Sequence, residues 1–179
     1  MKNRFADDRL KVFINAIGYM VVWWGSVLAA RNDFWWFGPL LAILFMSWHI
    51  ASKTFIKGEF LVTGVIVISG FLFDSVLTAL NFVEYKSSWG ENAIVAPLWI
   101  GGIWLGFALT VNHSFKSILS RPIVAILLGL IGGPLTYRGA AGLGAISLTR
   151  PAIALITLGV AWGVMMWLMS KHAIIKGRR

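Results

Sequence analysis

Six long apolar stretches, separated by short polar segments, make up most of the chain. They cover residues 12–30, 34–52, 59–82 and 95–112, a stretch that runs from residue 122 into a glycine-rich segment, and residues 151–170. Each approaches the length of about 20 residues that a helix needs to cross the hydrocarbon core of a bilayer. The pattern predicts an all-α polytopic membrane protein: a bundle of six transmembrane helices that forms one transmembrane domain over residues 1–179.

The first apolar stretch follows a basic segment, as the core of a signal peptide does. A signal peptide has a shorter apolar core, of about 7–15 residues, which ends at a small-x-small cleavage site. The stretch over residues 12–30 is longer and contains Trp23 and Trp24. We therefore expect a retained helix.

The fifth apolar stretch leads into the most unusual segment of the chain. Residues 132–145 read Gly-Gly-Pro-Leu-Thr-Tyr-Arg-Gly-Ala-Ala-Gly-Leu-Gly-Ala. Proline removes a backbone donor from a helix and clashes with the preceding turn. The segment therefore predicts a broken or kinked fifth helix. Residues 139–149 fit either the end of this helix or an irregular outer segment.

Composition supports the membrane assignment and excludes several other classes. The chain is 58% hydrophobic and 13% charged, whereas soluble domains carry about 25% charged residues. It has no cysteine, which excludes disulfides, thiolate metal sites and iron–sulfur clusters. The net charge of +9 lies at the ends of the apolar stretches and not on an amphipathic face, so we expect no nucleic-acid partner.

Lysine and arginine distribute unequally between the two sides that six crossings would create. Four lie on one side: Arg31, Lys86, Arg138 and Arg150. The other twelve of the 16 lie at the termini and in the second and fourth connections: Lys2, Arg4, Arg9, Lys11, Lys53, Lys57, Lys116, Arg121, Lys171, Lys176, Arg178 and Arg179. Cytoplasmic loops carry an excess of basic residues. We expect both termini in the cytoplasm.

Two charged residues are predicted to lie inside the bundle. Asp74 lies about 22 Å from the cytoplasmic start of its helix and Arg138 about 24 Å from Pro122, at a rise of 1.5 Å per residue. Since an unpaired charge at membrane depth is costly, we expect the two to pair. Thr136 and Tyr137 would add hydrogen bonds. This predicts a ligand site for a lipid or other amphiphilic anion, with Arg138 as the binding group. The alternatives are a structural ion pair, or an Arg138 that extends to the outer interface.

A second polar cluster is expected near the cytoplasmic boundary. Asn15, His49, Asn112 and His113 all fall about 3–10 Å inside it by the same rise. Histidines there could move protons. They could equally be interfacial side chains hydrogen-bonded to the backbone, Asn15 or Asn112. Two histidines are too few for zinc, and no Asp or Glu is placed to complete a ligand set, so neither a metal nor a cofactor is predicted.

Small residues and tryptophans indicate how the helices pack. Three stretches carry glycines four residues apart: Gly102 and Gly106, Gly129 and Gly133, and Gly159 and Gly163. Such pairs let helices approach closely in a membrane. Trp23, Trp24, Trp104 and Trp162 fall near mid-depth, where they could line an apolar pocket for an acyl or isoprenoid chain or face the lipid.

The function that these patterns favour is binding or movement of a membrane lipid. No nucleotide-binding, zinc-protease or serine-nucleophile motif is present. Two alternatives stay open. One is a lipid-modifying membrane enzyme, or enzyme subunit, that would use His49, His113 and Asp74 for proton transfer. The other is a scaffold whose basic loops hold soluble lipid-modifying enzymes.

The chain resembles a small bacterial inner-membrane family, the domain of unknown function 2878. The resemblance extends over nearly the whole chain, and residues 132–145 are its most specific part. It is carried by Asn15, Trp23-Trp24, His49, Asp74-Ser75, Pro97-Leu-Trp, Trp104, Asn112-His-Ser114 and Gly-Gly-Pro-Leu-Thr-Tyr-Arg-Gly. Members are often encoded beside cyclopropane-fatty-acid-type methyltransferases and other lipid-modifying enzymes of an oxidative-stress response. The resemblance implies a role in membrane-lipid physiology and assigns no catalytic residue.

Overall fold

The computed structural model describes residues 2–90 and 93–177, with side chains described from residue 9 to residue 171 outside that gap. The fold is all-α apart from one pair of short strands, as predicted. Seven helices are present in the described residues: α1 (Lys2–Arg31), α2 (Phe37–Ala51), α3 (Glu59–Ala79), α4 (Leu98–Ala108), α5 (Lys116–Leu119), α6 (Pro122–Gly142) and α7 (Pro151–Gly177). The strands are β1 (Val83–Tyr85) and β2 (Ile146–Leu148).

Four of the helices are long and apolar enough to cross a membrane. These candidate spans are Arg9–Arg31, Glu59–Ala79, Pro122–Gly142 and Pro151–Lys171. Helices α2 and α4 are apolar but have only 15 and 11 residues. The prediction of a spanning helix over residues 95–112 was therefore wrong in extent. Pro97 precedes α4 in an extended conformation, and turns follow it from Leu109 to Phe115.

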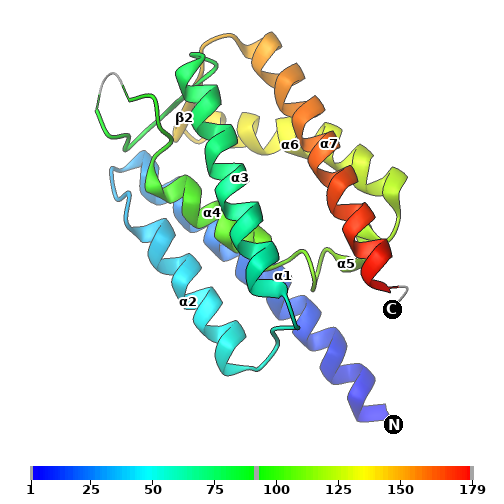
Figure 1. Ribbon diagram of the computed structural model, residues 1–179. Coiled ribbons are helices and arrows are strands. Elements are labelled where there is room, and N and C mark those ends of the chain that lie inside the picture. The colour runs from blue at the N-terminus through cyan, green and yellow to red at the C-terminus, as the bar shows by residue number, and fades with distance from the viewer. Residues whose placement is uncertain (1, 91–92, 178–179) are drawn as a thin grey trace.

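The helices form two groups, which Figure 1 shows on either side of the molecule. One group contains α1, α2, α3 and α4, with α4 packed against the other three. The other is an antiparallel pair, α6 and α7. The start of α1, the α2–α3 connection, α5 and the end of α7 lie toward the same end of the molecule (Figure 1). The two strands lie at the opposite end.

Glycines set the closest helix contacts, as the spacing predicted. A Cβ built on Gly129 would lie 2.4 Å from the carbonyl oxygen of Trp162, so α6 and α7 touch backbone to backbone there. A Cβ on Gly102 would lie 2.9 Å from the backbone of Gly38 and Pro39. Helices α4 and α2 therefore also touch at their backbones. Close packing of this kind replaces the hydrophobic effect as the attraction between helices in lipid.

Helix α6 is continuous from Pro122 to Gly142, with Pro134 inside it. The predicted break is therefore absent. Proline at position 134 cannot donate to the Leu130 carbonyl four residues earlier. A Cβ built on Gly159 of α7 would lie 3.0 Å from that oxygen and 3.4 Å from the Pro134 ring. The missing side chain at Gly159 makes room for the proline and the freed carbonyl, so the helix continues past them.

The strands link the two helix groups. β1 follows α3 and pairs antiparallel with β2, which follows α6, with Tyr85 opposite Ile146. Tyr85 and Ile146 point inward and are buried, while Glu84 and Ser147 are exposed. Residues 139–149, left open by the sequence, therefore divide: the helix ends at Gly142, a turn with Gly144 at φ +79° follows, and β2 begins at Ile146.

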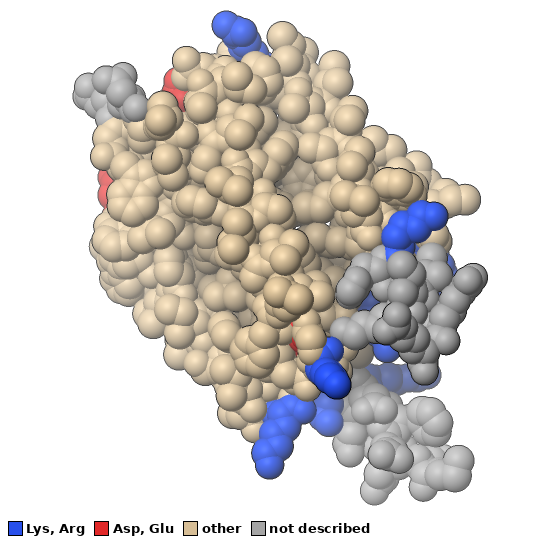
Figure 2. Space-filling view, viewed as in Figure 1, with Lys and Arg blue, Asp and Glu red and all other residues tan. Residues whose placement is uncertain are grey.

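Exposed charged side chains lie toward the ends of the molecule, as is typical of a protein that spans a membrane. In the face shown in Figure 2, lysine and arginine side chains lie toward the two ends, and uncharged residues cover the middle. Large apolar side chains such as Leu61, Ile123 and Ile156 are more than two-thirds exposed on the helix surfaces. Exposed apolar faces of this extent mark a surface covered by lipid or protein.

Candidate functional site

An apolar cavity of about 190 Å³, hereafter the chamber, lies between the two helix groups. Its lining is rich in aromatic side chains from α1, β1, α4, α6 and α7 and from the turn before α5: Tyr19, Trp23, Tyr85, Trp99, Trp104, Phe107, Phe115, Tyr137 and Trp162. The sequence had suggested that mid-depth tryptophans line an apolar pocket. Three of the four do so, whereas Trp24 is exposed.

Asp74 of α3 is the one acidic side chain in the lining of the chamber, and it is 1% exposed. The Tyr85 hydroxyl donates to Oδ1 at 2.5 Å, the Trp104 Nε1–H donates to Oδ2 at 2.6 Å, and the Tyr137 hydroxyl also donates to Oδ1. Burial, together with the neighbouring Asp74 carboxylate, raises the pKa of Tyr85 well above its usual value. Tyr85 is therefore a stable donor, and the carboxyl group is satisfied by hydrogen bonds from three separate elements.

Glycines allow this arrangement by making room for the indole rings. A Cβ built on Gly70 would lie 2.0 Å from the ring of Trp104, so only glycine permits the ring to lie against α3. Trp104 stacks on Trp162 with ring centroids 5.1 Å apart, and Trp162 in turn covers Gly133 of α6. The stack connects α3, α4, α7 and α6 across the chamber.

The predicted Asp74–Arg138 ion pair is not formed. Asp74 bonds to the two tyrosines and the tryptophan, and Arg138 is exposed. Helix periodicity explains the difference, because adjacent residues point about 100° apart. Tyr137 faces the chamber, and Arg138 lies on the outer face of α6 with the exposed side chains of Ile131 and Leu135. Gly142 ends the helix about 6 Å further on, within reach of an extended arginine.

The chamber is only partly enclosed, and its lining is most exposed along α6. Its most exposed lining residues, Leu128 and Thr136, are on α6, and the half-buried Tyr19 and Trp23 face them from α1. Thr136 donates to the Gly133 carbonyl at 2.7 Å. Of the four residues predicted for the ligand site, the structure thus brings Asp74, Thr136 and Tyr137 to one cavity and leaves Arg138 outside it.

The second predicted cluster lies at the other end of the bundle. Asn15, His49, Asn112 and His113 line one pocket of about 410 Å³. Asn15 Nδ2 lies 2.9 Å from His49 Nε2 and donates to the Leu109 carbonyl at 3.0 Å, while its Oδ1 accepts from the Ser114 N–H at 3.1 Å. Asn15 therefore satisfies backbone groups of the irregular segment after α4, which a bilayer could not.

The hydrogen bonds of His49 determine which of its nitrogens carries the proton. The Thr54 hydroxyl donates its hydrogen to the His49 carbonyl at 3.1 Å. The Thr54 hydroxyl oxygen is therefore the acceptor in its contact with His49 Nδ1, at 2.7 Å. His49 Nε2 then accepts from Asn15. Both nitrogens are engaged in the Nδ1–H tautomer, and His49 has a structural role.

Glu59 is a residue that the sequence reasoning overlooked. It is fully buried at the start of α3; its Oε1 lies 2.8 Å from His113 Nε2, and its Oε2 accepts from the Ile56 N–H at 2.9 Å. A carboxylate thus contacts one of the two histidines, a neighbour that the sequence analysis had not assigned to them. A signal was present, since Glu59 opens an apolar stretch at the same predicted depth as His113. Among the described residues, no group of three or more His, Asp or Glu is arranged to hold a metal ion.

The two sites are far apart. His113 contacts Glu59 at the start of α3, and Asp74 lies fifteen residues later on the same helix, about 22 Å away by helical rise. The three residues that the enzyme alternative would use, His49, His113 and Asp74, therefore do not form a single site. Tyr85 was missed because it lies in what looked like a polar loop, and only strand pairing carries it to Asp74.

The long apolar helices and the exposed apolar faces define a membrane-embedded α-helical protein. Within this class the chain belongs to the family described as protein of unknown function (DUF2878), whose model matches residues 12–168. No curated protein and no solved structure matches the chain.

Proposed function

We propose that the protein binds a membrane lipid by taking its apolar chain into the chamber. The carrying observation is the chamber itself: a cavity of about 190 Å³ that is lined almost entirely by apolar and aromatic side chains and is only partly enclosed. A cavity of about 150 Å³ lined by apolar residues stays dry and binds an apolar molecule. In a bilayer, an acyl or isoprenoid chain is the abundant candidate.

The position of Asp74 inside the chamber limits where the polar headgroup of this ligand can lie. Its carboxyl oxygens already accept three hydrogen bonds, and an anionic group beside them would be repelled. We therefore propose that an anionic headgroup stays outside the chamber, near Thr136 at the opening. Arg138 is the basic residue of α6 nearest to Thr136 in sequence; it is exposed on the outer face of the helix, and we propose that its long side chain contacts the headgroup from there.

The topology that goes with this proposal is six crossings with both termini in the cytoplasm of a bacterial inner membrane. Support comes from the twelve-to-four distribution of basic residues and from the common end shared by α1's start, the α2–α3 connection, α5 and α7's end (Figure 1). Helices α2 and α4 are shorter than the hydrocarbon core of a bilayer. At α4, the irregular segments before and after the helix would span the remaining thickness, where neighbouring helices shield their backbone groups from lipid.

A photoreactive fatty acid in phosphatidylcholine nanodiscs tests the proposal. Label is expected on chamber residues such as Phe107 and Met166. Gly132→Leu should reduce this labelling about tenfold, since a leucine there displaces two or more buried methylenes of the ligand. A Cβ at Gly132 meets only the Leu128 side chain, at 3.5 Å, so the variant can fold.

Gly64→Leu is the matched control, because a Cβ at Gly64 has no atom within 4 Å and the residue does not line the chamber. Labelling confined to outward-facing residues, or equal in Gly132→Leu and Gly64→Leu, would refute chain binding. The photoreactive fatty acid carries an anionic carboxylate, so Arg138→Gln should also reduce its labelling, whereas labelling by the neutral methyl ester of the same fatty acid should not change. Equal losses for the two probes would remove Arg138 from the headgroup site.

A further inference from the structure

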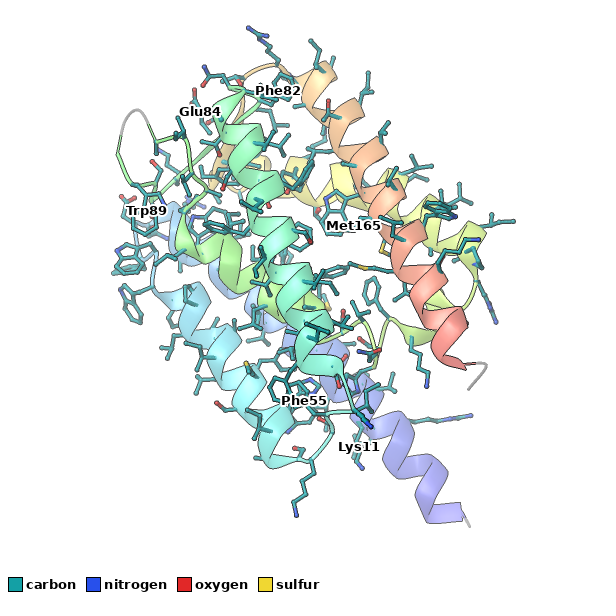
Figure 3. The ribbon with its side chains drawn as sticks, viewed as in Figure 1. Lys11, Phe55, Phe82, Glu84, Trp89 and Met165 are labelled. Atoms are coloured by element: carbon teal, nitrogen blue, oxygen red, sulfur yellow. The ribbon has the colours of Figure 1, made fainter. Side chains whose placement is uncertain are left out.

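The pocket at the α2–α3 end of the molecule, hereafter the basic pocket, carries an excess of positive charge that its own structure leaves unbalanced. Three of its lining residues are lysines from three separate segments: Lys11 of α1, Lys53 of the α2–α3 connection and Lys116 of α5. The pocket has a volume of about 410 Å³, and no carboxylate is among the lining residues that the structure describes. Figure 3 shows Lys11 beside the connection that carries Phe55.

Among the residues whose side chains are described, the carboxylate at this end of α3 is already engaged. Glu59 bonds His113 and the Ile56 backbone, and it lies behind the pocket wall, fully buried. Asn15 and His49 are likewise occupied by each other, by Thr54 and by the backbone. No carboxylate with a described side chain therefore lines the pocket beside the three ammonium groups.

One further lining residue carries a buried amide donor. The side-chain Nδ2 of Asn112 makes no hydrogen bond of normal geometry in the described part of the chain, and the carboxylate that it interacts with is Glu59. An amide group on the same pocket wall as the lysines adds a neutral contact for an oxygen-rich anion.

We propose that the basic pocket binds a phosphate group. Lysine ammonium groups bind phosphate as point charges, and three of them with no carboxylate present favour a group that can carry more than one negative charge over a single carboxylate. The phosphate belongs either to a phospholipid headgroup or to a soluble phosphorylated molecule. The site is separate from the chamber, so the proposal does not depend on chain binding there.

The test measures phosphate binding to the full chain in two arms. In the first, short-chain phosphatidic acid is titrated into detergent-solubilised protein and bound copies are counted by native mass spectrometry. In the second, line broadening of inorganic phosphate is followed by phosphorus NMR. Binding in the first arm alone assigns a lipid headgroup, binding in the second assigns soluble phosphate, and binding in neither overturns the proposal.

Two double variants separate the pocket from general surface charge. Lys53→Gln with Lys116→Gln removes two lining lysines and should weaken binding by about tenfold or more. Lys57→Gln with Lys171→Gln removes the same charge from exposed lysines that do not line the pocket, and should change binding less than about twofold. Equal weakening by both, or unchanged binding in the first, overturns the proposal. All four lysines are exposed, so both proteins should fold, which circular dichroism checks.

Discussion

Tyr137 of α6 donates its hydroxyl to Oδ1 of Asp74 on α3, across the chamber. This bond joins the α6–α7 pair to the four-helix group through a buried polar contact. The strand pair and the Trp104–Trp162 stack are the neighbouring links between the two groups. The position of α6 relative to α3, and with it the shape of the chamber, therefore depends on a small number of contacts.

Tyr137→Phe should lower the free energy of unfolding by about 1.5–3 kcal/mol, because it removes a hydrogen bond to a carboxylate and leaves that oxygen with one donor fewer. Unfolding in mixed detergent micelles measures the change. Tyr19→Phe is the control, since Tyr19 lines the same chamber and makes no hydrogen bond through its hydroxyl in the described structure. If both variants are equally stable, the bond to Asp74 contributes nothing.

Gly70→Ala should destabilise the fold by about 1–3 kcal/mol, the usual cost of overpacking, because the new methyl group would overlap the Trp104 ring. The Trp104 bond to Asp74 should be strained or lost as the ring shifts. At Gly64, on the same helix, an added Cβ meets nothing within 4 Å. Gly64→Ala should therefore be neutral or stabilising by up to about 1 kcal/mol. Equal unfolding midpoints for the two variants would contradict the packing described here.

Asn15→Leu should destabilise the protein by at least about 3 kcal/mol. It leaves His49 Nε2, the Leu109 carbonyl and the Ser114 N–H without partners, at about 1–3 kcal/mol for each buried group. Asn32 is exposed and bonds only the Leu28 carbonyl of its own helix. Asn32→Leu should change stability by less than about 0.5 kcal/mol. The same unfolding assay compares the two, and a small effect at Asn15 would show that water replaces it.

The absence of cysteine makes the proposed topology directly testable. Single-cysteine variants at the exposed Ser52, Ser88, Ser117 and Ser147 can be labelled with a membrane-impermeant maleimide. Six crossings predict that Ser52→Cys and Ser117→Cys react from the cytoplasmic side, and Ser88→Cys and Ser147→Cys from the outer side. Reaction of adjacent connections from the same side would show that α2 or α4 does not cross.

The proposed docking of soluble lipid-modifying enzymes stays a separate prediction. Basic side chains in the α2–α3 connection and near α5, including Lys53, Lys57, Lys116 and Arg121, are exposed. Two of these, Lys53 and Lys116, line the basic pocket, so a bound phosphate would reduce the charge available to a protein partner there.

The sequence alone determined the positions of the helices along the chain and the approximate depth of each polar residue in the bilayer. The apolar stretches predicted the helices, the glycine pairs predicted where helices touch, and the depth estimates grouped Asn15, His49, Asn112 and His113, which share one pocket. These follow from helical rise and from the cost of polar groups in hydrocarbon, both local properties.

The tertiary structure alone decided the partners of Asp74. Depth is fixed by counting residues, but the direction of a side chain depends on how its helix is rotated, and one residue changes that direction by about 100°. This rotation turned Tyr137 toward Asp74 and Arg138 toward the lipid. Tyr85 reached the same carboxylate through the pairing of β1 with β2, segments more than 60 residues apart in the chain. Contacts of such long sequence separation leave no periodic pattern, so the sequence could place a charge inside the bundle without identifying what satisfies it.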